Sequence, residues 1–215
     1  MTDNPVISVS QDAGASLSEA AGVIESGGVI GYPTETVYGL GADSGNRHAL
    51  RRIFALKQRP ENKPFPLLIS SAVAASAWVQ EIPELAERLM AAFWPGPLTL
   101  VFQGSDALNA LVPWEETRVG LRVSPDPVCR ALTERLRRPL VSTSANPAGR
   151  PPATTASEVD AYFAGELDLI LDDGPRNRQT VSTLLDITVN PPRLLRTGAI
   201  AKEQIETIIG DIDEP

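Results

Sequence analysis

The sequence predicts an α/β domain built on a twisted mixed sheet, with parallel and antiparallel strands and with helices on its faces. Strand-like and helix-like segments are mixed along the chain without a strict β–α alternation, and several strand pairs are joined by short turns. No repeat, linker or low-complexity tract divides the 215 residues. We therefore expect one domain over residues 15–215, preceded by a loose tail at 1–14.

The first half of the chain predicts alternating elements bounded by glycine, proline and helix-capping residues. The stripe of Leu17, Ala20, Ala21 and Ile24, for example, predicts a helix that Gly27 ends. The expected helices are 16–26, 47–58, 71–80 and 83–93, and the expected strands are 6–9, 29–32, 65–70 and 98–102.

In the second half, residues 103–117 read as irregular, and charged and apolar residues then alternate over 118–123. Such alternation is typical of a half-buried strand, and it places Arg118 and Arg122 on one face. The remaining expected strands are 118–123, 139–143, 167–171, 180–186 and 193–196, and the expected helices are 125–137, 157–163 and 202–209.

Composition excludes several classes of site. The formal net charge of −8 disfavours non-specific adhesion to nucleic acid or acidic membranes, so an anionic ligand needs a local basic cluster. The single cysteine, Cys129, excludes an internal disulfide, and with the single histidine, His48, it is too little for a Cys/His zinc site. We expect Cys129 in the core and His48 on the surface.

No apolar run reaches the roughly 18 residues that a membrane-spanning helix needs. The N-terminus lacks the basic and apolar regions of a signal peptide. We therefore expect a cytoplasmic protein.

The stretch YPTETVYGLG at 32–41 is the first candidate for a functional site. An apolar strand meets Pro33, which we expect to end regular pairing, and then opens into Thr34, Glu35 and Thr36. Hydroxyls and glycines at a strand end suit the wall of a small-molecule site. A tight strand-to-loop corner is the alternative interpretation.

A second candidate is Lys57, which continues the apolar stripe of Leu50 and Ile53 and is therefore expected to face the interior or a cleft. A lysine that extends to water is the alternative. Arg59 and Lys63 follow, so this segment is basic in an acidic chain. Ser144 and Asn146 follow another strand end and could add neutral donors. These groups suit an anionic ligand such as phosphate, or else form a solvated basic turn.

Neither a phosphate-binding G-x-x-x-x-G-K-[ST] loop nor a G-x-G-x-x-G turn occurs. Several motifs nevertheless recur in one order in a known family. They are YPTETVYGLG (32–41), KQRP (57–60), WPGPLT (94–99), RV (122–123), STSAN (142–146), STLLD (182–186) and LRTGAI (195–200). On these motifs the chain resembles the YrdC/TsaC family of L-threonylcarbamoyladenylate synthases, over about residues 16–210. Its length resembles the short, single-domain bacterial form.

The resemblance implies a YrdC-like fold with a concave cavity. It also implies a nucleotidyltransferase that makes threonylcarbamoyl-AMP and pyrophosphate from L-threonine, bicarbonate and ATP. Mg²⁺ is expected on the ATP phosphates, and no residue is assigned as its ligand. The product would pass to a threonylcarbamoyltransferase complex that modifies an adenosine of tRNA. Direct contact between this chain and tRNA stays open at this point.

The resemblance also assigns residues to the two substrates. Lys57 and Arg59 are the expected catalytic residues, facing the phosphates. The expected ATP-binding set is Lys57, Arg59, Lys63, Ser144, Asn146 and Arg196. The expected threonine-binding set is Thr34, Arg122, Thr143 and Ser182, with Arg122 on the carboxylate.

Three alternatives remain open at this point. The chain could be a non-catalytic module of the same fold that binds double-stranded RNA or tRNA. It could be the carbamoyl-adenylate-forming domain of a hydrogenase maturation protein, which its free-standing length disfavours. It could also be an inactive paralogue, against which the Lys57-x-Arg59 and Ser144-x-Asn146 pairs argue.

Overall fold

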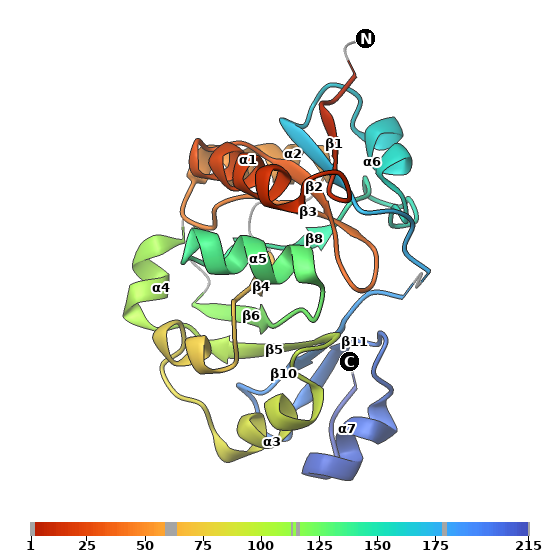
Figure 1. The fold of residues 1–215 in the computed structure, drawn as a ribbon. Helices are drawn as coiled ribbons and strands as arrows, with labels where there is room; N and C mark the ends of the chain where they lie inside the picture. Colours follow the sequence, from red (N-terminus) through yellow and green to blue (C-terminus); the bar gives the residue numbers. More distant parts are fainter. Residues whose placement is uncertain (1–2, 59–63, 113, 115–116, 178–179, 215) are drawn as a thin grey trace.

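The computed structural model describes residues 3–58, 64–112, 114, 117–177 and 180–214. Its elements are arranged around two sheets (Figure 1). The helices are α1 (Ala13–Glu25), α2 (Arg47–Leu56), the 3₁₀ helix η1 (Val73–Ala77), α3 (Glu84–Phe93), α4 (Asp106–Leu111), α5 (Pro127–Leu136), α6 (Ala156–Tyr162) and α7 (Lys202–Ile209).

The strands confirm a mixed topology, divided between two sheets. The five-stranded sheet has the order β1-β9-β2-β3-β8, and the six-stranded sheet has the order β11-β10-β5-β6-β4-β7. Each sheet contains parallel and antiparallel pairs. The strands are β1 (Val6–Ser8), β2 (Ile30–Pro33), β3 (Tyr38–Gly41), β4 (Leu67–Leu68), β5 (Leu98–Gln103), β6 (Arg118–Arg122), β7 (Leu140–Val141), β8 (Thr143–Ser144), β9 (Leu169–Asp172), β10 (Thr183–Asp186) and β11 (Arg193–Arg196).

The two sheets meet where the chain passes from β7 to β8. The predicted strand 139–143 is split here, because β7 pairs with β4 in one sheet and β8 pairs with β3 in the other. The Val141 amide donates to Ala42 and the Ser142 amide donates to Pro66, so both sheets hold the crossing. The hydroxyls of Ser142 to Ser144 are thereby placed at the junction of the sheets.

Helices cover both faces of the five-stranded sheet. On one face, Ile30 and Tyr32 of β2 pack in a cluster with Leu17 of α1 and Leu132 of α5. On the other face, a Cβ at Gly31 would lie 2.8 Å from Val159 of α6, so the glycine permits the helix to pack closely. In Figure 1, α1 and α5 lie together, and α3 and α7 pack at the far end.

Several local predictions differ from the structure. The stretch 103–117, expected to be irregular, contains the helix α4. Ser105 caps its N-terminus, because the Ser105 hydroxyl accepts a hydrogen bond from the Leu108 amide. The predicted helix 71–80 is only the 3₁₀ turn η1. Pro33, by contrast, is the last residue of β2 and pairs with Tyr38, so the strand ends there as expected. The strand expected at 6–9 is present as β1 and pairs with β9, whereas α1 begins at Ala13, earlier than the expected helix start.

The burial of Cys129 and the exposure of His48 agree with the expectations from the sequence. Cys129 is a buried free cysteine and His48 is exposed. Burial raises the pKa of Cys129 and of the neighbouring Tyr32 well above their usual values, so both stay protonated at neutral pH. Among the described helices, none is long and apolar enough to cross a membrane.

Candidate active site

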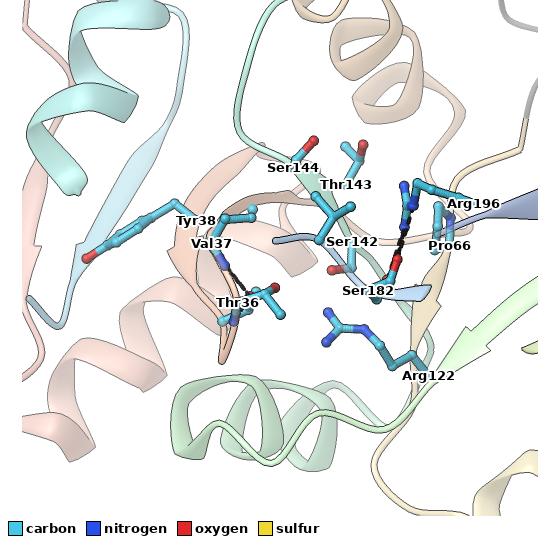
Figure 2. A pocket seen from close by; sticks show the side chains of 13 residues that line it. Thr36, Val37, Tyr38, Pro66, Arg122, Ser142, Thr143, Ser144, Ser182 and Arg196 are labelled. Atoms are coloured by element: carbon cyan, nitrogen blue, oxygen red, sulfur yellow. Dashed lines mark hydrogen bonds between the residues drawn. The ribbon is translucent and has the colours of Figure 1, made fainter. Parts of the chain in front are cut away.

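A pocket lies where the loop between β2 and β3 faces β8, the end of β6 and the start of β10 (Figure 2). Its volume is about 60 Å³. The deep cavity implied by the resemblance stays a prediction. The pocket wall includes six of the ten predicted site residues, namely Thr34, Arg122, Thr143, Ser144, Ser182 and Arg196.

Arg122 enters the pocket as one half of a buried ion pair. It ends β6, and its Nη1 donates to Oε1 of Glu35, while Ser124 Oγ donates to the other carboxylate oxygen at 2.5 Å. The side chains of Arg122 and Glu35 are only 6% and 12% exposed. The carboxylate therefore holds the guanidinium in place, and the remaining N–H groups of Arg122 are available to a ligand.

Ser182 enters the pocket beside Arg196, as Figure 2 shows. Arg196 donates from Nε and Nη2 to the Ser182 carbonyl, at 3.1 and 2.9 Å, and from Nη2 to Ser182 Oγ at 3.1 Å. The Ser182 hydroxyl also lies 3.0 Å from that of Thr99, a buried residue of β5. Arg196, which is predicted to contact ATP, and Ser182, which is predicted to contact threonine, are thus hydrogen-bonded to each other.

We call Glu35, Thr99, Arg122, Ser182 and Arg196 the arginine side of the pocket. Thr34 lies next to it, and its hydroxyl is engaged within its own turn. The Thr34 hydroxyl donates to the Val37 carbonyl at 2.7 Å and accepts from the amides of Thr36 and Val37. In this conformation Thr34 shapes the loop that carries Glu35.

Lys57, Ser144 and Asn146 form a second group, which we call the lysine side. Lys57 caps the C-terminus of α2 and is buried, so the prediction that it faces the interior is confirmed. Its Nζ donates to the carbonyls of Ser144 and Asn146, at 2.5 and 3.0 Å, and lies 3.3 Å from Oδ1 of Asn146. The Ser144 hydroxyl donates to the same oxygen at 2.6 Å.

The structure therefore brings Lys57, Ser144 and Asn146 together, although they lie 87 and 89 positions apart along the chain. The two other predicted cations, Arg59 and Lys63, lie outside the described residues. Sequence reasoning did not assign Glu35 or Thr99, although both occur in the quoted motifs. Their signal was a carboxylate between two hydroxyls and a threonine at the second position of a strand.

A larger pocket adjoins the first and shares Pro66 and Arg196 with it. Its volume is about 340 Å³, and it lies over the six-stranded sheet between Leu184, Leu195 and Arg118. Apolar side chains with arginines at the margin can accept a flat, partly apolar group that carries an anion. The adjoining pockets could thus hold two ligands, or two parts of one ligand.

Tyr38 forms part of the pocket wall and ties down the segment that follows β9. Its hydroxyl donates to the Gly174 carbonyl at 2.8 Å and lies 3.3 Å from a carboxylate oxygen of Asp172. Arg176 of the same segment contacts Asp126 and Asp173 and lies over the Tyr38 ring. Burial raises the pKa of Tyr38 to about 12.

Comparison with known proteins gives a family and several relatives. The family model Sua5/YciO/YrdC, described as "Telomere recombination", matches residues 22–198. A threonylcarbamoyl-AMP synthase of Pyrococcus abyssi is 40% identical over 193 residues, which are 90% of this chain and 57% of the relative. One of Pseudomonas putida KT2440 is 40% identical over 171 residues, which are 80% of this chain and 92% of the relative.

Solved structures show the same fold. P. abyssi Sua5 complexed with L-threonine has a TM-score of 0.88 and 36% identity, covering 100% of this chain and 62% of that one. Escherichia coli YciO has a TM-score of 0.84 and 26% identity, covering 95% of this chain and 100% of that one. This chain therefore spans less than two thirds of the P. abyssi protein but the whole of YciO.

Proposed function

This chain belongs to the Sua5/YciO/YrdC family, and on that premise we propose that it is an L-threonylcarbamoyladenylate synthase. One observation carries the proposal. The arginine side offers a guanidinium and hydroxyls in a small pocket, and the lysine side, with a buried ammonium, adjoins it through Ser144. An amino acid and a polyphosphate need such neighbouring sites if one is to react with the other.

The reaction forms two bonds. The threonine amine attacks the carbon of bicarbonate, water leaves, and a carbamate results. A carbamate oxygen then attacks the α-phosphorus of ATP, the bond from that phosphorus to the bridging oxygen breaks, and pyrophosphate leaves. Catalysis of this kind depends mainly on positioning and on neutralising phosphate charge.

We assign the arginine side to L-threonine. The free N–H groups of Arg122 would bind the carboxylate, with Thr143 and Ser182 completing the pocket and Thr34 shaping its loop. The depth of the ion pair with Glu35 supports this assignment, because it fixes the guanidinium before any ligand arrives.

We assign the lysine side to the phosphates of ATP, with Lys57 as the principal cation and Ser144 and Asn146 as neutral partners. Arg59 and Lys63 belong to this set by resemblance. Arg196 would contact the nucleotide at the junction of the two pockets, which leaves the larger pocket for the base and ribose.

Mg²⁺ fits this site as an ion that the nucleotide carries. Within the described ranges, no cluster of three or more Asp, Glu, His or Cys side chains could hold a metal ion by itself. An ATP-bound Mg²⁺ usually keeps several waters and takes phosphate oxygens as ligands. It would supply charge neutralisation on the phosphates. The product is proposed to pass to a tRNA-modifying transferase complex.

The proposal is tested by pyrophosphate release from MgATP, with L-threonine and bicarbonate omitted in turn. Release that requires both substrates supports the synthase. Release that is indifferent to threonine, or no release, contradicts it. RNA titrated at several salt concentrations would then test the non-catalytic binding module, whose affinity should fall steeply with salt.

A further inference from the structure

Thr99 is a buried hydroxyl residue for which the proposed reaction has no direct use. It lies on β5, opposite Leu184 of β10, and is 0% exposed. Its Oγ1 lies 3.0 Å from Ser182 Oγ, and within the described part of the chain this is its only hydrogen bond. The direction of that bond decides what Ser182 can offer to a ligand.

A hydroxyl has one proton to donate and two lone pairs that accept. Ser182 Oγ already accepts a proton from Nη2 of Arg196 at 3.1 Å. If Ser182 donated to Thr99, the Thr99 proton would be buried without an acceptor, and an unsatisfied buried donor is strongly unfavourable. If Thr99 donates instead, Ser182 accepts two protons, and its own proton remains for the pocket.

The backbone at Ser182 is held independently of this hydroxyl pair. The Thr183 amide donates to Pro97 at 2.9 Å. Gly198 packs directly against the same stretch, since a Cβ there would lie 2.5 Å from the Ser182 carbonyl carbon. Removing the Thr99 hydroxyl should therefore change the direction of the Ser182 O–H bond more than the position of its oxygen.

We infer that Thr99 is a positioning residue that, together with Arg196, fixes Ser182 as a hydrogen-bond donor toward a ligand oxygen in the pocket. The inference rests on the proposed function, under which that oxygen belongs to the carboxylate or the carbamate of the threonine substrate. Arg122 enters the same pocket with N–H donors only. Both groups thus select for an anionic oxygen and against an ammonium group at this point.

The test compares Thr99→Val, which removes the hydroxyl at similar volume, with Thr99→Ser, which keeps it. We expect Thr99→Val to raise the KM for L-threonine about tenfold, the loss of one hydrogen bond to a charged group. The KM for MgATP should change by less than about twofold, and Thr99→Ser should stay within about twofold of wild type. Thr99→Ala against Thr99→Ser gives the same comparison if the valine variant does not fold.

A double-mutant cycle separates positioning from a purely structural role. If Thr99 acts through Ser182, Thr99→Val should add nothing to Ser182→Ala, because the hydroxyl that it orients is gone. The inference would be overturned if the effects of the two substitutions on the KM for threonine multiplied, or if Thr99→Val kept the KM of the wild type. In either case, turnover by the wild-type protein would leave the proposed function intact. A wild-type protein that neither binds L-threonine nor releases pyrophosphate would remove both.

Discussion

The arginine side and the lysine side of the pocket are held in different ways. On the arginine side, Arg122 and Ser182 are bonded to side chains that come from, or directly follow, paired strands, and these contacts exist before any ligand arrives. On the lysine side, Lys57 donates to backbone carbonyls, those of Ser144 at the end of β8 and of Asn146 beyond it, and it has an acceptor for each of its three protons. A phosphate must therefore compete with the protein for Lys57, whereas a carboxylate meets N–H groups of Arg122 that are already oriented.

Under the proposed assignment, the threonine site is therefore more preorganised than the phosphate site. A preformed site binds its ligand without first breaking internal contacts. A lysine that exchanges its partners contributes to catalysis only after the nucleotide is present. Substitutions on the arginine side should therefore change stability and threonine affinity, and substitutions on the lysine side should chiefly change turnover.

The largest effect is expected for Glu35→Ala, which leaves Arg122 buried without its carboxylate partner. Breaking a buried pair by removing one partner costs about 3 to 5 kcal/mol of unfolding free energy. Urea unfolding measures the loss, and Glu35→Gln, which keeps an acceptor for Arg122, should lose less. A Glu35→Ala variant as stable as wild type would show that the arginine side is not held by this pair.

On the lysine side, Lys57→Ala and Arg59→Ala should each lower turnover by roughly 10²-fold or more, the usual loss of one charge-stabilising donor. Initial rates of pyrophosphate release measure this. Lys202→Ala, on α7 with partners Glu206 and Glu214, is a matched control that should keep normal rates. Near-normal turnover in both site variants would remove the phosphate assignment.

A smaller effect is expected at Tyr38, whose hydroxyl donates to Gly174. Tyr38→Phe should lose about 1 kcal/mol of stability at neutral pH, the net value of a typical hydrogen bond. Burial raises the pKa of Tyr38 to about 12 in the folded protein. The folded state therefore favours the protonated hydroxyl, and this contribution is lost as the pH rises from about 10, the unfolded value, toward 12.

Urea unfolding of wild type and Tyr38→Phe between pH 8 and about 11.5 checks this sign. The stability difference between the two proteins should shrink as the pH rises, because tyrosinate cannot donate to Gly174. A difference that grows with pH would contradict it. Lysines titrate in the same range in both proteins, so only the difference is informative.

Local sequence pattern predicted what depends on neighbouring residues. The apolar stripe that runs from Leu50 to Lys57 predicted that the lysine is buried. The alternation of charged and apolar residues over 118–123 predicted the strand that carries Arg122. Glu35 with Arg122, and Thr99 with Ser182, are pairs 87 and 83 positions apart. No periodicity within one segment can predict such pairs, since the fold of the whole chain brings them together.

The division into two sheets was missed for a related reason. Residues 139–143 read as one strand, but the first part pairs with β4 as β7 and the last part pairs with β3 as β8, so the two ends belong to different sheets. Strand propensity carries no information about which partner a strand will choose. The short helix α4 was missed because its six residues are too few for a clear apolar period.

The contrast between the two sides is tested most directly by calorimetric titration of L-threonine into nucleotide-free protein, with wild type, Arg122→Lys and Lys57→Ala compared. We predict saturable binding to wild type, binding of similar strength to Lys57→Ala, and much weaker binding to Arg122→Lys, whose ammonium cannot reproduce the forked donors. Threonine that binds only when MgATP is present, or binding lost equally in both variants, would contradict a preformed arginine side.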